Sequence, residues 1–116
     1  MFAPGKDFHS IDPRVRIGHV HLTVSDLERS LEFYCGVFGF ELMQRLGTEA
    51  AFISAGGYHH HIGLNTWESF GGSPPPPGTT GLFHVAIAYP DRATLGDALR
   101  RLSRPKSRSR ARVITV

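Results

Sequence analysis

Histidine is the residue type in this sequence whose spacing best indicates chemistry. His19 and His21 stand two positions apart, a run of three histidines occupies positions 59–61, and His84 stands alone. Imidazole nitrogens bind divalent transition metals and exchange protons near neutral pH. A purification tag would lie at a terminus, whereas this run lies in the interior, so a metal site or a substrate site is the hypothesis to pursue.

The first two histidines belong to a segment with the alternation of a strand. In residues 16–24, the apolar set Val20, Leu22 and Val24 alternates with His19, His21 and Thr23. Successive strand residues point to opposite faces. We therefore expect one apolar face and one face that carries His19 and His21.

A helix and three more strands are predicted after this segment. Ser25 is expected as the helix N-cap, with Glu28 completing a capping box. Residues 40–47 and 49–57 have the composition of two strands separated at Gly47, and the histidine segment is predicted as the next strand. The apolar residues at helical spacing are Leu27, Leu31, Tyr34, Cys35 and Phe38. The predicted order is βαβββ.

The triple histidine leads into the last of these strands, in which Ile62 and Leu64 are apolar. The alternation places His60 on their side. The residues expected on the opposite face are His59, His61, Gly63 and Asn65. For His21, His59 and His60, a structural hydrogen-bonded role remains the alternative to a functional one.

The second part of the sequence repeats the first. Residues 70–81 are rich in Gly and Pro, which predicts a stiff linker. Beyond it, residues 84–99 align with residues 19–34 at an offset of 65 without a gap, so that His84 matches His19. A strand near residues 82–89 and a helix after it are therefore predicted.

The charge is distributed unevenly. From Arg100 onward there are seven basic residues and no acidic one, whereas Met1 to Leu99 carries ten acidic and six basic residues. A basic tail can bind nucleic acid or anionic lipid, but no aromatic residues separate these charges, so nucleic acid is not expected as a partner. With Cys35 as the single cysteine and neither a membrane span nor a signal peptide pattern, we expect a cytoplasmic protein.

The segment GHVHLTVSDLERSLEFYCGVFGFEL, followed by three strands, a Gly/Pro linker and GLFHVAIAYPDR, resembles the vicinal-oxygen-chelate superfamily. That superfamily includes glyoxalase I, extradiol ring-cleavage dioxygenases and the bleomycin resistance proteins, and the likeness is greatest to small members similar to catechol 2,3-dioxygenase. The resemblance implies an α+β fold in a single domain, 1–116. Its expected parts are a βαβββ module (16–67), a Gly/Pro linker (68–81), a partial second module (82–102) and a basic tail (103–116).

The resemblance also implies a metal site in a cavity between the two modules. His19 and His84 would be ligands of a divalent metal, Fe(II) or Mn(II) in preference to Zn or Ni, which would bind vicinal oxygens of a small, often aromatic, substrate. His61 would be an auxiliary ligand or a catalytic contact. The implied substrate contacts are His21, His59 and Asn65.

The sequence departs from the superfamily pattern in two places. Gly63 stands where glyoxalase I has a glutamate ligand, which disfavours an isomerase, and no acidic residue follows Asp97 to supply the usual carboxylate ligand. We therefore expect a truncated second module with weakened metal binding. An extradiol-type dioxygenase is the favoured function, and a metal-free binding or resistance protein and an inactive truncated member are the alternatives. Because the incomplete second sheet would leave an unpaired edge, a homodimer is expected, with exchanged strands as one form it could take.

Overall fold

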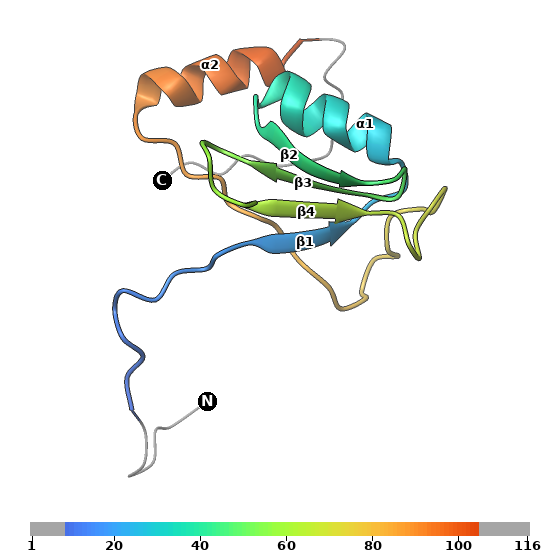
Figure 1. The fold of residues 1–116 in the computed structure, drawn as a ribbon, viewed down its shortest axis with the longest axis horizontal. Coiled ribbons are helices and arrows are strands. Elements are labelled where there is room, and N and C mark those ends of the chain that lie inside the picture. Colours follow the sequence, from blue (N-terminus) through green and yellow to red (C-terminus); the bar gives the residue numbers. More distant parts are fainter. Residues whose placement is uncertain (1–8, 105–116) are drawn as a thin grey trace.

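The computed structural model describes residues 9–104 of the chain, and Figure 1 shows their arrangement. The elements are β1 (Val20–Thr23), α1 (Leu27–Leu31), η1 (Glu32–Val37), β2 (Glu41–Leu46), β3 (Ala50–Ser54), β4 (Ile62–Asn65) and α2 (Arg92–Leu102). The predicted α+β class and the βαβββ order of the first part are therefore confirmed. None of the helices in this part of the chain is long and apolar enough to cross a membrane.

The strands form one mixed sheet in the order β1-β4-β3-β2. Strand β1 runs parallel to β4, with His21 opposite Gly63 and Thr23 opposite Asn65, and the other pairs are antiparallel. β1 is an edge strand, and within residues 9–104 no strand pairs with its outer side. An edge of this kind offers unpaired backbone groups to another strand.

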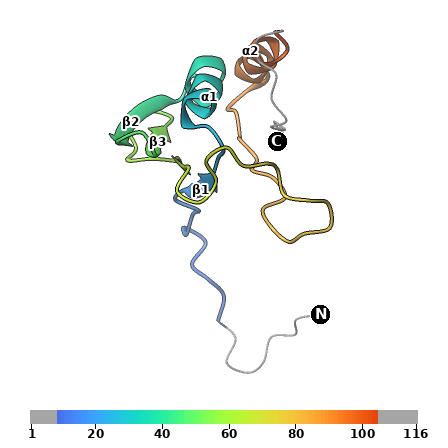
Figure 2. The same cartoon turned by 90° about the vertical axis from the view of Figure 1, so that its right-hand side faces the viewer.

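The hydrophobic core lies between α1 and one face of the sheet. Ile53 and Leu64 have no exposed surface, and burial of a side chain of this size stabilises the fold by roughly 1.5–3 kcal/mol. The buried cluster consists of Leu27, Leu31, Ala51, Ile53, Ile62 and Leu64. Both helices lie on this side of the sheet (Figure 2), so within residues 9–104 no helix covers the face that carries the polar alternates of the strands. This face is called the open face below.

The N-cap of α1 is Asp26, and the prediction of Ser25 was wrong. The backbone of Asp26 is extended, with φ −150° and ψ 110°, and its carboxylate accepts the backbone N–H of Arg29 at 3.0 Å. Ser25 instead accepts a hydrogen bond from the guanidinium of Arg29 at 2.6 Å. Both residue types are suitable N-caps. Because α1 begins at Leu27, the residue directly before it, Asp26, takes the capping position.

The helix continues as a π-helical segment, η1. The backbone N–H of Phe38 donates to the carbonyl of Phe33 at 3.3 Å, five residues earlier. Aromatic rings lie together at this wider turn. The ring centroid of Phe33 is 5.0 Å from those of both Tyr34 and Phe38. Burial raises the pKa of the Tyr34 phenol above its usual value.

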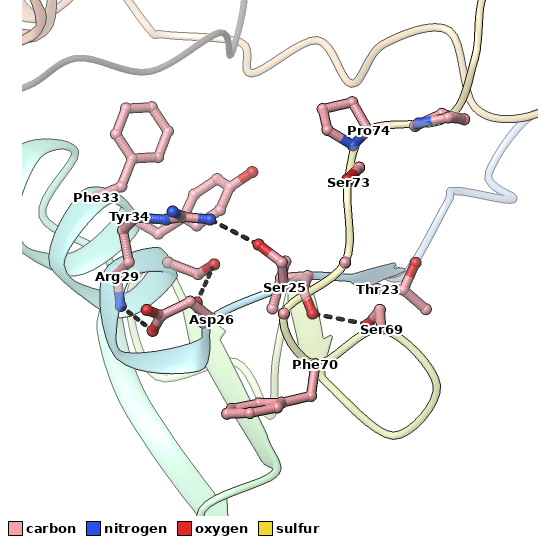
Figure 3. Close-up of a pocket in the computed structure, with 15 residues that line it drawn as sticks. Thr23, Ser25, Asp26, Arg29, Phe33, Tyr34, Ser69, Phe70, Ser73 and Pro74 are labelled. Carbon is pink, nitrogen blue, oxygen red and sulfur yellow. Dashed lines mark hydrogen bonds between the residues drawn. The ribbon is translucent and has the colours of Figure 1, made fainter.

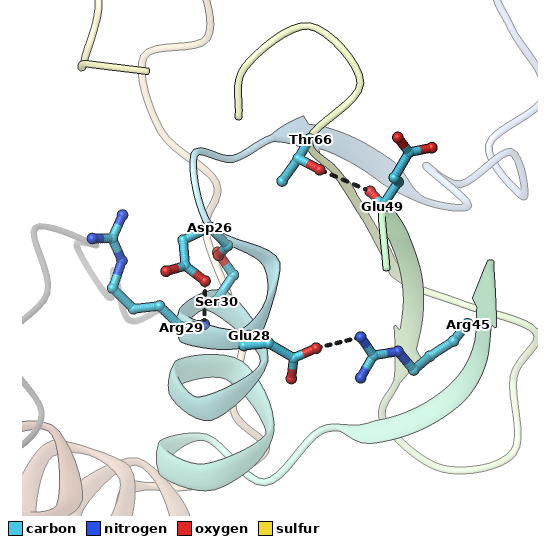
Figure 4. Close-up of polar contacts among 7 residues, drawn as sticks. All are labelled: Asp26, Glu28, Arg29, Ser30, Arg45, Glu49 and Thr66. Atoms are coloured by element: carbon cyan, nitrogen blue, oxygen red, sulfur yellow. Dashed lines mark hydrogen bonds and ion pairs between the residues drawn. The ribbon is translucent and has the colours of Figure 1, made fainter. Parts of the chain in front are cut away.

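Polar contacts connect α1 and the far strands of the sheet (Figure 4). Glu28 on α1 forms an ion pair with Arg45 on β2. The backbone N–H of Thr66, just after β4, donates at 2.9 Å to the carbonyl of Glu49, just before β3. These contacts fix the ends of the strands on which the open face is built.

The second part of the chain forms its predicted helix but not its predicted strand. Asp91 caps α2 by accepting the backbone N–H of Thr94 at 2.8 Å, whereas residues 82–89 have no strand structure. An isolated strand cannot satisfy its own backbone groups, and no neighbouring strand in the described chain pairs with this segment. Leu82 and Phe83 are 65% and 86% exposed. Most of the predicted basic tail, residues 105–116, lies outside the described residues.

Candidate functional site

The open face carries a group of histidines and aromatic rings. Phe52 lies on this face, since its neighbours Ala51 and Ile53 both point into the core. Its ring centroid lies 6.1 Å from that of His21 and 5.0 Å from that of His60. Strands β1 and β3, together with the loop before β4, therefore bring these three rings onto one surface.

His21 is held by a chain of hydrogen bonds that runs through Asn65. The side-chain nitrogen of Asn65 lies 2.7 Å from Nε2 of His21, and the Asn65 oxygen accepts the backbone N–H of Trp67 at 3.1 Å. Asn65 is only 5% exposed, whereas His21 is exposed. The ring of Trp67 lies 5.8 Å from that of His21 and is tilted by 33°. In this group, His21 therefore faces solvent and is held from below by the buried amide of Asn65.

His19 lies against two histidines of the consecutive run. Its ring centroid is 4.3 Å from that of His60 and 6.1 Å from that of His59, and Nδ1 of His59 lies 2.9 Å from Nδ1 of His60. Burial, followed by the charges of His19, His59, His21 and His61, lowers the pKa of His60 below its ordinary value. The cluster therefore favours the neutral imidazole at His60, which is the form that can accept a proton or a metal.

The side chain of His60 does not follow the predicted alternation. Its ring contacts Phe52 and His19 rather than joining the buried Ile62 and Leu64. The alternation was wrong here because residues 55–59 form a bend, and a strand period does not extend through a bend. His60 therefore belongs to the open-face group.

His61, the residue before β4, has its side chain next to the end of β3. Its Nδ1 accepts the backbone N–H of Ala55 at 3.1 Å and lies 3.3 Å from the hydroxyl of Ser54. Its ring lies 4.6 Å from the ring of Tyr58. With Nδ1 accepting, Nε2 carries the proton of the neutral imidazole.

His84 is in a different place from the open-face group. It lines a cavity of about 650 Å³ together with Leu22, Tyr34 and Phe38, and Leu22 and Tyr34 pack against the core on the helix side of the sheet. Its ring contacts Phe83 at 5.0 Å. Within residues 9–104, no hydrogen bond or ring contact joins His84 to His19.

The fit of a metal ion can be judged from these positions. In the described part of the chain, no three His, Cys, Asp or Glu side chains are grouped so that they could hold a metal ion. Within residues 9–104, the implied ligands His19 and His84 are therefore not members of such a group.

A wide groove borders the C-terminal end of β1, between α1 and the start of the Gly/Pro segment (Figure 3). Its volume is about 970 Å³, and Arg29, Tyr34, Phe70 and Pro74 are among the residues that line it. The Ser69 hydroxyl donates to the carbonyl of Val24 at 2.7 Å and so ties the segment after β4 to the end of β1. No pattern in the sequence indicated this groove, because its walls come from segments about forty residues apart.

Gly63, Trp67 and His60 are site residues whose roles the sequence analysis did not identify. A glycine inside a strand often marks a close approach, and a Cβ at Gly63 would stand 2.7 Å from Nδ1 of His21. The glycine in the strand was visible in the sequence. The residue that approaches it, His21, could be named only from the pairing of β1 with β4.

Comparison with known proteins agrees with this fold. The model of the Glyoxalase/Bleomycin resistance protein/Dioxygenase superfamily matches residues 16–108. A catechol-2,3-dioxygenase of Bacillus subtilis (strain 168) is 45% identical over 80 residues, which make up 68% of this chain and 28% of that protein. The chain thus spans little more than a quarter of the length of this relative.

Solved structures share the arrangement of strands and helices. A lactoylglutathione lyase from Agrobacterium tumefaciens superposes with a TM-score of 0.56 at 22% identity, over 78% of this chain and 70% of the other. A possible glyoxalase from Bacillus cereus gives a TM-score of 0.56 at 22% identity, over 75% of this chain and 70% of the other. At this identity the likeness concerns the fold alone. Together with the match over residues 16–108, it shows that the chain belongs to the glyoxalase/bleomycin resistance protein/dioxygenase superfamily.

Proposed function

We propose that the chain takes part in a divalent-metal-dependent oxidation of the extradiol dioxygenase type, with a small aromatic or vicinal-oxygen compound as substrate. The observation that carries this proposal is the 45% identity over 80 residues to a protein named catechol-2,3-dioxygenase. Gly63 in β4 supports it against an isomerase, because the superfamily resemblance puts a glutamate ligand of glyoxalase I at that position. The activity of the longer relative is part of the proposal, since this chain matches 28% of it.

The proposed metal ligands are His19 and His84, contributed by two copies of the chain in a homodimer. Both side chains are exposed, and they do not meet within one described chain. The unpaired outer side of β1 is a site to which residues 82–89 of a second copy could add as a strand. Exposed Leu82 and Phe83 would be covered in that arrangement. Fe(II) or Mn(II), when bound, would supply an electrophilic centre that orients two substrate oxygens.

The open face would receive the substrate. The rings of Phe52 and Trp67 flank His21 and offer flat contacts to an aromatic ring. His61 is proposed as the catalytic proton donor through Nε2, because Ala55 occupies its Nδ1. His59 is proposed as a further substrate contact beside His19.

Activity of the loaded protein tests this proposal. The purified chain is loaded with Fe(II) without air, and the ring-opened product of catechol is followed by its visible absorbance. Turnover is expected to disappear with a chelator and in His19→Ala and His84→Ala, and to persist in His9→Ala, which changes an exposed histidine before β1. Turnover that both the chelator and His19→Ala leave intact would contradict metal-dependent catalysis at this site.

Mixing the two inactive variants tests whether the site lies between chains. In a mixed dimer of His19→Ala with His84→Ala, one of the two sites retains both histidines. Random mixing therefore restores about a quarter of the wild-type activity if the site is shared between chains. Failure of the mixture to recover activity, when both variants are dimeric, would show that the ligands come from a single chain.

A metal-free binding function is the second candidate, favoured by the cavity beside Leu22. Its volume of about 650 Å³ and its mainly apolar lining, which includes Phe38 and Phe83, are typical of small-molecule sites. Catechol binding, measured by equilibrium dialysis, would then be unchanged by a chelator. A loss of binding on chelation would count against this candidate.

A further inference from the structure

We propose that Asn65 is a positioning residue that holds His21 in a single tautomer on the open face, and that Gly63 provides the space in which His21 lies. The expectation from the superfamily resemblance was different, since it made Asn65 a substrate contact. The inference rests on the proposed function only in taking the open face as the side that receives a ligand. It concerns the free protein and requires neither metal nor substrate.

The orientation of the Asn65 amide follows from its neighbour in the chain. The backbone N–H of Trp67 lies 3.1 Å from the side-chain oxygen of Asn65 and donates to it. An amide nitrogen in that position would place two donors against each other, so this contact determines which end of the amide is which. The side-chain nitrogen of Asn65 is therefore the end that faces His21.

The tautomer of His21 follows in turn. The Asn65 nitrogen is only a donor, so Nε2 of His21, at 2.7 Å, must accept. A neutral imidazole carries one proton, which must then be on Nδ1. In this state His21 offers a hydrogen-bond donor to a ligand, and its Nε2 is not available as a base or as a metal ligand.

Burial separates the role of Asn65 from that of His21. Asn65 is 5% exposed, and both ends of its amide are engaged by Trp67 and His21. It therefore has little surface to offer a substrate, whereas the exposed imidazole of His21 can reach one. In a buried environment a satisfied hydrogen bond of this kind rigidifies the group that it holds.

Gly63 is the third part of the arrangement. It stands opposite His21 in the parallel pair of β1 with β4. A Cβ on Gly63 would lie 2.7 Å from Nδ1, 3.0 Å from Cε1 and 3.2 Å from Cγ of the His21 ring. These are below contact distances, so any side chain at this position would displace the ring from Asn65.

The class of ligand that this arrangement favours is an aromatic compound with an oxygen acceptor. The ring of Trp67 lies at 5.8 Å and that of Phe52 at 6.1 Å from His21. These rings can contact a planar ligand, while the Nδ1 proton of His21 is available to a carbonyl or phenolate oxygen. A fixed donor recognises such an oxygen at a lower entropic cost than a free one.

The tautomer can be measured directly by NMR on the full chain. Long-range proton–nitrogen spectra of ¹⁵N-labelled protein at about pH 8.5, some two units above the ordinary histidine pKa, distinguish the two neutral forms. His21→Gln identifies the His21 signals by their loss. We expect the Nδ1-protonated form in the wild type. An Nε2-protonated form there would overturn the inference.

Two variants separate positioning from general structural support. Asn65→Asp replaces the donor by an acceptor, so the His21 proton is expected to move to Nε2, while the signals of His84, in another part of the fold, stay unchanged. Gly63→Ala is expected to shift the His21 signals and mix the two forms, with the circular dichroism spectrum retained. If Asn65→Asp fails to fold, Gly63→Ala still decides: unchanged His21 signals in that variant would contradict the proposed contact.

The result is independent of turnover. Inactive protein with the Nδ1 tautomer would contradict the proposed function and leave the positioning intact. Active protein with the Nε2 tautomer would agree with the proposed function and contradict the positioning of His21.

Discussion

The guanidinium Nε of Arg101, near the end of α2, donates a hydrogen bond to the backbone carbonyl of Val37 at the end of η1. The two residues are 64 positions apart in the sequence, so this bond connects the second part of the chain to the first. It also satisfies a carbonyl at a helix end, where no later N–H of the same helix is available.

Replacing Arg101 should therefore loosen the contact between the helices. Arg101→Ala is expected to lower the free energy of unfolding by about 1.5 kcal/mol, as for other hydrogen bonds from charged groups. Arg100→Ala is the matched control, since exposed Arg100 pairs with Asp97 on its own helix and should cost less than about 0.5 kcal/mol. Urea denaturation of both variants measures the difference. Equal effects would show that the contact with Val37 does not stabilise the fold.

The capping of α1 predicts a contrast between neighbouring residues. Asp26→Ala removes the acceptor of the Arg29 N–H and is expected to destabilise the chain by about 1 kcal/mol. Ser25→Ala removes only the contact with the exposed guanidinium of Arg29 and is expected to cost less than half as much. Thermal and urea unfolding of the two variants check this. A larger effect at Ser25 would restore it as the cap.

The core predicts a large effect at Leu64 in β4. This side chain has no exposed surface, so Leu64→Ala leaves a cavity and should lower the free energy of unfolding by about 3 kcal/mol. Leu46→Ala in β2 is the control because Leu46 is 47% exposed, and its cost should stay below about 1 kcal/mol. Similar losses in both variants would mean that β2 is covered in solution, as in a homodimer.

The cap of α2 predicts a pH dependence. Hydrogen bonds from the backbone N–H and hydroxyl of Thr94 lower the pKa of Asp91 below its usual value of 3.8. Because the folded pKa is the lower one, this stabilisation is complete above the unfolded value and is lost as the pH falls through the folded value. The Cα chemical shifts of residues 92–95 should move toward coil values on acidification from about pH 6 to about pH 2.

Asp91→Asn is the control for that titration. An asparagine is also a good N-cap but has no carboxyl group to protonate. The first turn of α2 in this variant should keep its shifts over the same range. A variant that frays like the wild type would assign the acid sensitivity to another group.

Local periodicity was sufficient to predict the βαβββ unit. Val20, Leu22 and Val24 alternate, and the helical stripe from Leu27 recurs at three and four residues, because side-chain direction along a regular backbone depends only on position in the repeat. The same reasoning predicted α2. It failed at the bend of residues 55–59, which interrupts the repeat before His60, and the ring of His60 lies against that of His19.

The sequence by itself determined the class of fold, the order of its first elements, and the presence of His21 on a strand, whereas His19, expected on the same strand, lies just before its first residue. These properties depend on local backbone geometry and on burial of apolar alternates. The tertiary structure decided which residues meet: Asn65 with His21, His60 with His19, and His84 beside Leu22. It also decided that residues 82–89 are not a strand in this chain, because a strand requires a partner to bond its backbone. Such contacts depend on pairing between segments far apart in the chain, which no local pattern specifies.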